Sequence, residues 1–259
     1  TIRSCCRMSR RPCMSMTMAG ADFQTIQAAV IAAYAGDTIV VKAGAYTENV
    51  LVDKQLTIRS EDGSDAVTVT ATSADAPVFD LNADGIIIEG FSVRGLTNEH
   101  VAGIEIVDFD DCEVRYNDCA NCYNGIHIGN AVEETATGNI VEENYCHDNT
   151  RRGISLRDQV SGNTVYNNTC RNNEDGEICI KDTPPHDNII WANTFDGTVE
   201  IKYGNIFHSP EEVTYTYGDT EFTGYVGNYY TGYSGEDGNG DGIGDTPMSY
   251  GTYKDEYPP

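Results

Sequence analysis

The chain has 259 residues, which is enough for one long domain or for one domain with small caps at its ends. It holds 41 acidic and 16 basic residues, and the formal net charge of −25 argues against nucleic acid and anionic membranes as partners. No apolar run approaches the roughly 18 residues that a membrane-spanning helix needs, so no membrane span is expected.

Residues 1–19 match nothing that follows them. They contain arginines, methionines and cysteines, but no apolar stretch of the kind found in a signal peptide. We expect this leader to lie outside the fold, as a flexible arm or a remnant of expression.

Residues 22–35 predict an amphipathic helix. Asp22 is a favourable N-cap residue, and Gly36 is expected to end the helix. One face of the helix carries the apolar residues Ile26, Ala29, Val30 and Ala33. Short segments rich in Val, Ile and Thr follow as far as residue 70 and predict strands, and the segments 77–81 and 85–91 begin the regular coil. Stacked strands expose an apolar end whose edges invite aggregation, so we expect the helix to cover that end.

The middle of the chain is a repeat. Each copy opens on an alternating strand, which reads Gly-Ile-Glu-Ile at 103–106, Gly-Ile-His-Ile at 125–128, Gly-Ile-Ser-Leu at 153–156, Glu-Ile-Cys-Ile at 177–180 and Thr-Val-Glu-Ile at 198–201. Later in each copy an asparagine recurs at 117, 144, 168 and 193, which is 27, 24 and 25 residues apart. A self-similar period of this length, with no helical pattern inside it, predicts stacked structural repeats.

We therefore expect an all-β fold, a single-stranded parallel β-helix over residues 20–206. Each coil climbs one strand spacing, roughly 4.8 Å, so that equivalent side chains lie above one another. Asparagines can then form ladders of amide hydrogen bonds, and the candidates are Asn117, Asn144, Asn168 and Asn193, with Asn139, Asn163 and Asn188.

Nine cysteines is an odd count, so at least one is unpaired. Cys119, Cys146 and Cys170 fall on one predicted inward column. Stacked neighbours have parallel Cβ vectors that suit a disulfide poorly, which favours buried free thiols. A metal site built from Cys119, Cys122, Cys146 and His147 is the alternative.

Alternate positions of the repeat strands point outward. One outward row is predicted to hold Asp80, Glu105, His127, Ser155, Cys179 and Glu200. A second row, two positions on, places Arg157, Lys181 and Lys202 beside Asp158 and Asp182. A ligand on this fold would lie along such rows.

Two kinds of catalysis fit these rows. In a polysaccharide lyase, an Arg or Lys base removes a proton from a uronate while a cation neutralises its carboxylate, with Arg157, Lys181, Asp158 and Asp182 as catalytic candidates. Glu105, His127, Glu200 and Lys202 would then bind substrate. An inverting glycoside hydrolase needs two carboxylates about 6.5–9.5 Å apart, for which Asp158 with Asp182, or Glu105 with Asp80, are candidates. A charged sheet face that only contacts solvent shows the same alternation.

Residues 207–259 are rich in Tyr, Thr and Gly and are expected to cap the C-terminal end of the coil. Their tyrosines are expected to pack within this cap, with a sugar-stacking face as the alternative. The tyrosines concerned are Tyr215, Tyr217, Tyr225, Tyr229, Tyr230 and Tyr233.

The most specific motif is Asp-Gly-Asn-Gly-Asp-Gly-Ile-Gly-Asp at 237–245. It follows the first nine places of an EF-hand-type loop, which predicts a structural Ca²⁺ site. Met248 replaces the bidentate glutamate, so Asp255 or Glu256 would have to complete the site. The predicted ligands are Asp237, Asn239, Asp241, the carbonyl of Ile243, and Asp245.

The segments at 22–30 and 35–50 resemble the opening of pectate-lyase-like right-handed β-helix proteins. The later repeats, with Gly-Asn-Tyr-Tyr at 227–230, resemble the NosD-like group of carbohydrate-binding and sugar-hydrolase repeats. The resemblance implies a right-handed coil and covers residue 22 to the C-terminus. It leaves the activity open, because these groups include lyases, hydrolases, epimerases, periplasmic accessory proteins and archaeal surface proteins.

Three hypotheses remain. The first is a secreted or cell-surface β-helix that binds carbohydrate. Self-assembly, or a place as a structural module in a larger envelope protein, is compatible with this hypothesis. The second is an extracellular lyase or glycoside hydrolase that acts on acidic polysaccharide. The third is a NosD-like periplasmic accessory protein of copper enzymes, which gains no support because no Met/His cluster lies within the repeats. The glycan and the oligomeric state are not determined by the sequence.

Overall fold

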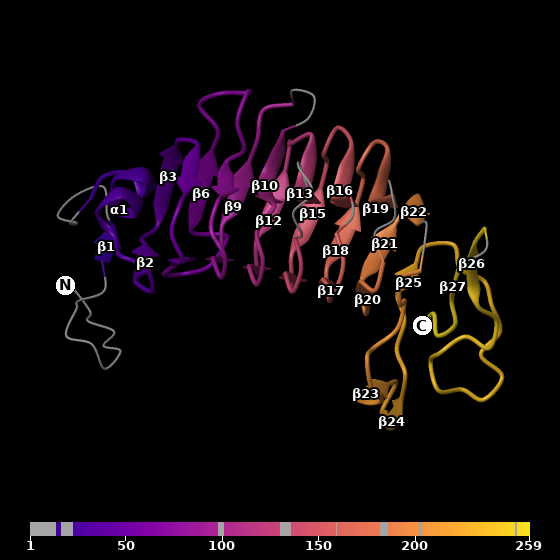
Figure 1. The fold of residues 1–259 in the computed structure, drawn as a ribbon. Coiled ribbons are helices and arrows are strands. Elements are labelled where there is room, and N and C mark those ends of the chain that lie inside the picture. The colour runs from indigo at the N-terminus through magenta and orange to yellow at the C-terminus, as the bar shows by residue number, and fades with distance from the viewer. Residues whose placement is uncertain are drawn as a thin grey trace.

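The computed structural model describes residues 14–16, 23–97, 101–129, 136–158, 160–181, 186–201, 204–251 and 253–259. The chain winds into an elongated right-handed β-solenoid, with a helix at the N-terminal end and an irregular cap at the other (Figure 1). Among the described residues, no helix has the length and apolar character needed to cross a lipid bilayer.

Three parallel sheets form the walls of the solenoid, and each coil contributes one strand to each sheet in the order A, B, C. Sheet A consists of β1 (Met14–Met16), β2 (Thr38–Val41), β5 (Thr57–Ser60), β8 (Ile87–Glu89), β11 (Glu113–Arg115), β14 (Ile140–Glu142), β17 (Thr164–Tyr166) and β20 (Ile189–Trp191). Sheet B consists of β3 (Gly44–Thr47), β6 (Val67–Thr70), β9 (Ser92–Arg94), β12 (Asp118–Ala120), β15 (Tyr145–His147), β18 (Thr169–Arg171), β21 (Thr194–Asp196) and β25 (Tyr229–Tyr230). Sheet C consists of β4 (Val50–Val52), β7 (Phe79–Leu81), β10 (Ala102–Val107), β13 (Asn124–Gly129), β16 (Arg152–Arg157), β19 (Gly176–Lys181) and β22 (Val199–Ile201). The predicted parallel β-helix is thereby confirmed.

The core is a set of inward columns. On sheet C, Ile104, Ile126, Ile154 and Ile178 pair in register and are fully buried. Burying such a side chain contributes about 1.5–3 kcal/mol to the stability of the fold. Because alternate residues of each strand point inward, every coil adds further contributions of this kind. The apolar half of the alternating pattern therefore holds the solenoid together.

The predicted asparagine ladders are present, and they stand where sheets A and B meet. Asn144 donates both its backbone N–H and its side-chain amide to Asn168 Oδ1, each at 3.0 Å, and Asn168 repeats this toward Asn193 at 2.9 and 3.0 Å. The residue before each ladder position is left-handed, with φ of 57°, 54°, 54° and 53° at Tyr116, Glu143, Asn167 and Ala192. Such a corner breaks the sheet hydrogen bonds, and the buried amides replace them.

Two further ladders stand at the other corners. Asn139, Asn163, Asn188 and Asn205 form the second, in line with the prediction for the first three. Asn149 and Asn173 form a third, which the sequence analysis missed; there Asn149 Nδ2 donates to Asn173 Oδ1 at 2.8 Å.

The N-terminal helix is shorter than predicted. Helix α1 spans Ile26–Ala32, and its N-cap is Thr25, whose side chain accepts from the Ala28 N–H. The prediction of Asp22 as N-cap is therefore wrong, and Asp22 itself lies outside the described residues. The Glu48 carboxylate accepts the N–H groups of Ile26 and Gln27, both at 2.9 Å, so a distant residue completes the cap.

Both predicted domain boundaries shift. Met14–Met16 forms β1 and pairs in parallel with β2, so this part of the leader belongs to sheet A rather than lying outside the fold; the rest of residues 1–19 lies outside the described residues. Past residue 206, β25 is the last strand of sheet B, so the cap is partly built into the coil. The cap also contains two antiparallel pairs, β23 (Val213–Tyr217) with β24 (Thr220–Gly224) and β26 (Met248–Tyr250) with β27 (Tyr253–Asp255).

Six cysteines lie in the described residues, and all are buried free thiols. Cys119, Cys146 and Cys170 stack in register with Phe195 as one inward column, as predicted.

Candidate functional site

The outward face of sheet C carries the predicted row of polar side chains. Its members pair in register from coil to coil, in the order Asp80, Glu105, His127, Ser155, Cys179 and Glu200. Arg157 and Lys181 also pair in register, as the second row predicted. We call this surface the sheet C face.

The N-terminal half of the sheet C face holds groups with shifted pKa values. Partial burial, with the charge of Asp80 on the neighbouring coil, raises the pKa of Glu105 to about 7, and burial also raises the pKa of Asp80. Burial lowers the pKa of His127 to about 4, although its Nδ1 lies 3.2 Å from the Ser155 carbonyl oxygen. Near neutral pH a partly protonated carboxyl group therefore lies next to a neutral imidazole.

Cations gather at the C-terminal half of this face, around Glu200. Arg152 Nη2 lies 2.8 Å from Glu200 Oε2, and Lys181 Nζ lies 3.3 Å from the same carboxylate. The Cys179 thiol donates to Glu200 Oε2 at 3.7 Å. The sheet C face therefore changes from acidic at β7 and β10 to basic at β16 and β19.

The sequence pattern predicts most of these residues but not Arg152. Asp158 follows β16 in a left-handed conformation with φ 65°, one residue past Arg157. Asp182 and Lys202 lie outside the described residues, so the pairing of Asp158 with Asp182 is untested. Arg152 was missed because it stands before the repeated Gly-Ile pattern, at a position held by Ala102 and Asn124 in earlier coils.

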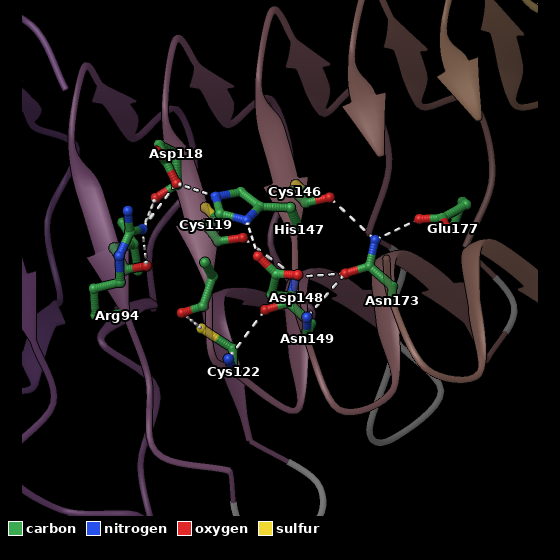
Figure 2. Close-up of polar contacts among 12 residues, drawn as sticks. Arg94, Asp118, Cys119, Cys122, Cys146, His147, Asp148, Asn149, Asn173 and Glu177 are labelled. Atoms are coloured by element: carbon green, nitrogen blue, oxygen red, sulfur yellow. Dashed lines mark hydrogen bonds and ion pairs between the residues drawn. The ribbon is translucent and has the colours of Figure 1, made fainter. Parts of the chain in front are cut away.

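Sheet B carries a second polar cluster on its outer face (Figure 2). His147 Nε2 lies 3.1 Å from Asp118 Oδ1, His147 Nδ1 lies 2.6 Å from Asp148 Oδ2, and Arg94 donates to the same Asp118 oxygen at 2.8 Å. His147 is thus directed to carboxylates on the outside, while Cys119 and Cys146 point inward. The metal site proposed for these cysteines is therefore not formed. Within the described ranges no three His, Cys, Asp or Glu side chains are gathered as they would be around a bound metal ion, and this includes the aspartates of the 237–245 loop, which would have to move together on binding.

The 237–245 loop is held by its own side chains. Asp237 accepts the N–H groups of Gly240, Asp241 and Gly242 at 2.7–3.1 Å, and Asp245 accepts that of Gly238 at 2.7 Å. Gly242 has φ 87°, which a non-glycine residue rarely adopts, so the loop curls at the position that the motif requires.

Asp255 is not available to this loop, contrary to the sequence prediction. It is fully buried and accepts from the Asn228 N–H at 2.7 Å, the Asn228 side-chain amide at 3.1 Å and the Tyr230 hydroxyl at 2.9 Å. Since Asn228 itself accepts from Asn193, the first asparagine ladder ends on a carboxylate.

The tyrosines of the cap divide into two groups. Tyr230 is buried against Phe195, with ring centroids 5.8 Å apart, and Tyr225 packs against Tyr257 at 5.4 Å, as predicted for packing residues. Tyr217 and Tyr229 remain about half exposed, at 54% and 48%.

Comparison with known proteins places the fold. The family model described as "Right handed beta helix region" matches residues 78–235. A cell surface glycoprotein of Methanothermus fervidus is 32% identical over 88 residues, which is 34% of this chain and only 14% of the glycoprotein's own length.

Two solved structures are similar to this chain over most of its length. The structure of Escherichia coli ybhc has a TM-score of 0.51 at 13% identity, covering 75% of this chain and 74% of that one. An alginate lyase from Paenibacillus sp. str. FPU-7 has a TM-score of 0.49 at 18% identity, covering 66% and 72%. At 13% identity the likeness to ybhc shows the fold alone.

Proposed function

The chain belongs to the right-handed β-helix family, and from this premise we propose that it is a secreted or cell-surface protein whose sheet C face binds carbohydrate. The likeness to a cell surface glycoprotein supports the location. Because the match spans a small part of that glycoprotein, we further propose that this chain acts as a module of a larger surface protein.

The observation that carries the binding proposal is the in-register polar row of the sheet C face. Asp80, Glu105 and His127 are partly exposed on three successive coils, one strand spacing apart, and Glu200 is partly exposed at the far end of the row. On the two coils between them Ser155 and Cys179 are buried, and Arg157 and Lys181 are the partly exposed side chains. A polymer of similar units can meet equivalent partners on successive coils. His127 and Glu105 are both partly exposed and lie side by side. The ring of His127 offers an apolar edge to a sugar, and the Glu105 carboxylate can accept a hydrogen bond from a sugar hydroxyl.

The second candidate function is cleavage of acidic polysaccharide by a lyase or glycoside hydrolase. It is favoured by one observation, the juxtaposition of Glu105, with its pKa raised to about 7, and the neutral His127. A carboxyl group with a pKa near 7 suits general acid–base catalysis at neutral pH, and the neutral His127 beside it would act as a hydrogen-bonding partner of the substrate. Arg157 and Lys181, in register on the same face, would bind the carboxylate of the substrate.

A glycan array followed by calorimetry tests the binding proposal. We expect binding that Glu105→Gln and His127→Gln weaken and that Thr164→Ala, on the outer side of sheet A, leaves unchanged. A protein that binds no glycan on the array would refute it. Incubation with polyuronates, read as absorbance of unsaturated products, tests the lyase; activity that survives both substitutions would place the chemistry away from this row.

We also propose that the 237–245 loop binds Ca²⁺ and stabilises the cap. Its support is the alternation of oxygen-bearing residues Asp237, Asn239, Asp241 and Asp245 around the curled Gly242, with the Ile243 carbonyl between them. We expect Ca²⁺ to raise the melting temperature and EGTA to reverse this. Asp241→Asn should abolish the effect, and Asp219→Asn, in the hairpin turn, should not. If Ca²⁺ leaves the melting temperature unchanged, the proposed calcium site is refuted.

A further inference from the structure

The cations at the C-terminal half of the sheet C face point to a subsite for a carboxylate. We propose that Arg152 and Lys181 bind a carboxylate group of an acidic polysaccharide, and that Glu200 occupies this subsite while no ligand is bound. This inference rests on the proposed binding of carbohydrate to the sheet C face and names the ligand class for one end of it.

Arg152 is an unusual residue for a sheet surface. Its side chain is only 9% exposed, and its Nη1 donates to the Asp175 carbonyl. Gly176 follows on the next coil with φ 139°, and a Cβ at that position would lie 2.8 Å from Arg152 Nη1. The missing side chain of Gly176 therefore makes room for the guanidinium, which is held at a fixed place on the face.

Glu200 accepts a hydrogen bond from only part of the Arg152 guanidinium. Its Nη2 donates to Glu200 Oε2, but its buried Nε has no hydrogen-bond partner among the residues that the structure describes. Nε and Nη2 form one edge of the guanidinium that matches the two oxygens of a carboxylate. A free carboxylate can approach this edge and satisfy both donors, whereas Glu200 accepts from Nη2 and not from Nε. A buried donor without a partner carries a cost that such a ligand would remove.

Glu200 is also the member of this cluster that can leave. It lies on β22, which has three residues, is the terminal strand of sheet C and pairs within that sheet with β19 alone. Arg152 and Lys181 lie on β16 and β19, which are paired on both sides. A ligand carboxylate would therefore replace Glu200 between two cations that stay in place, and Glu200 would move toward solvent.

The test compares Glu200→Gln with the unaltered protein, using sodium polygalacturonate and its carboxyl-reduced form as probes. Glu200→Gln keeps the size of the side chain and removes its competing charge. We expect it to bind polygalacturonate roughly five- to tenfold more tightly, with binding of the reduced polymer unchanged. We also expect its melting temperature to fall and to be restored by polygalacturonate, because the two cations lose and then regain a counter-charge.

Lys181→Gln in the Glu200→Gln background provides the second measurement. It should remove the gain in affinity, and Arg152→Lys should do the same by removing the fork while keeping the charge. If the unaltered protein binds glycans and Glu200→Gln gains nothing, or gains equally for the reduced polymer, the carboxylate subsite is refuted while the proposed function stands. If no variant binds any glycan, the proposed function itself fails.

Discussion

The outer faces of sheet A and sheet C are built by the same rule but are used differently. On sheet A, Arg115 lies 3.2 Å from Glu89, 3.1 Å from Glu113 and 3.7 Å from Glu142. The Tyr166 hydroxyl donates to Glu142, and the ring of Tyr166 stacks on Trp191 with planes only 2° apart. Opposite charges and flat rings thus meet their partners on the next coil.

In the N-terminal half of the sheet C face, the neighbours along the column do not match in this way. Asp80 and Glu105 place like charges on adjacent coils, and His127 is held neutral beside them. At the C-terminal half Glu200 does meet Arg152 and Lys181, but Arg152 Nε has no hydrogen-bond partner within the described part of the chain. Stacking of the coils therefore brings equivalent positions into one column on every sheet. Which residue types follow one another along that column decides whether its side chains satisfy each other and stabilise the solenoid, or keep polar groups that can bind a ligand.

Breaking the register should damage both faces at once and gives the largest expected effect. Asn168→Leu removes the acceptor of two Asn144 donors. It also removes the side-chain amide that donates to Asn193 Oδ1, although the backbone N–H of residue 168 still donates to that oxygen. Since each unsatisfied buried group costs about 1–3 kcal/mol, we expect a loss of about 3–5 kcal/mol in the free energy of unfolding, measured by urea denaturation. The exposed Asn82→Ala is the control, and an equal loss there would contradict the role of the ladder.

Glu105→Gln should affect the sheet C face alone, and only above acidic pH. Glu105 loses its proton near pH 4.5 when unfolded and near pH 7 when folded, so the folded state binds more protons between these values and its stability falls as the pH rises. At pH 8 we expect the substitution to stabilise the protein by roughly 2–3 kcal/mol, and at pH 4 to change little.

Urea denaturation at both pH values measures this difference. The exposed Glu221→Gln in the β23–β24 hairpin is the matched control and should show no such pH dependence. A gain for Glu105→Gln that is the same at pH 4 and pH 8 would mean that the ionisation of Glu105 is not its cause.

Arg115→Met should affect sheet A alone, with the smallest effect. Removing this cation leaves Glu89, Glu113 and Glu142 close together without a counter-charge. Because the network is partly exposed, we expect a loss of about 1–2 kcal/mol that shrinks in high salt, with glycan binding unchanged. Arg171→Met, which removes a cation packed over Tyr145, should cost less. If Arg115→Met impaired glycan binding, the conclusion that sheet A stabilises the solenoid while the sheet C face binds glycan would be wrong.

The sequence alone determined the repeat, the parallel stacking, the inward cysteine column, the first two asparagine ladders and the outward row from Asp80 to Glu200. A repeat of 24–27 residues fixes the register, because each coil brings the equivalent residue of the repeat above the one before it. Residues that follow this period could therefore be placed without coordinates.

Only the tertiary structure decided the contacts that break the period. Glu200 reaches Arg152 across 48 residues, Glu48 caps a helix that begins 22 residues earlier, and Asp255 ends a ladder from within the cap. These contacts depend on turn lengths, left-handed corners and the path of the cap, which set where side chains of unrelated repeats meet. Periodicity predicts which residues share a column, whereas the pairing of charges between columns requires the folded chain.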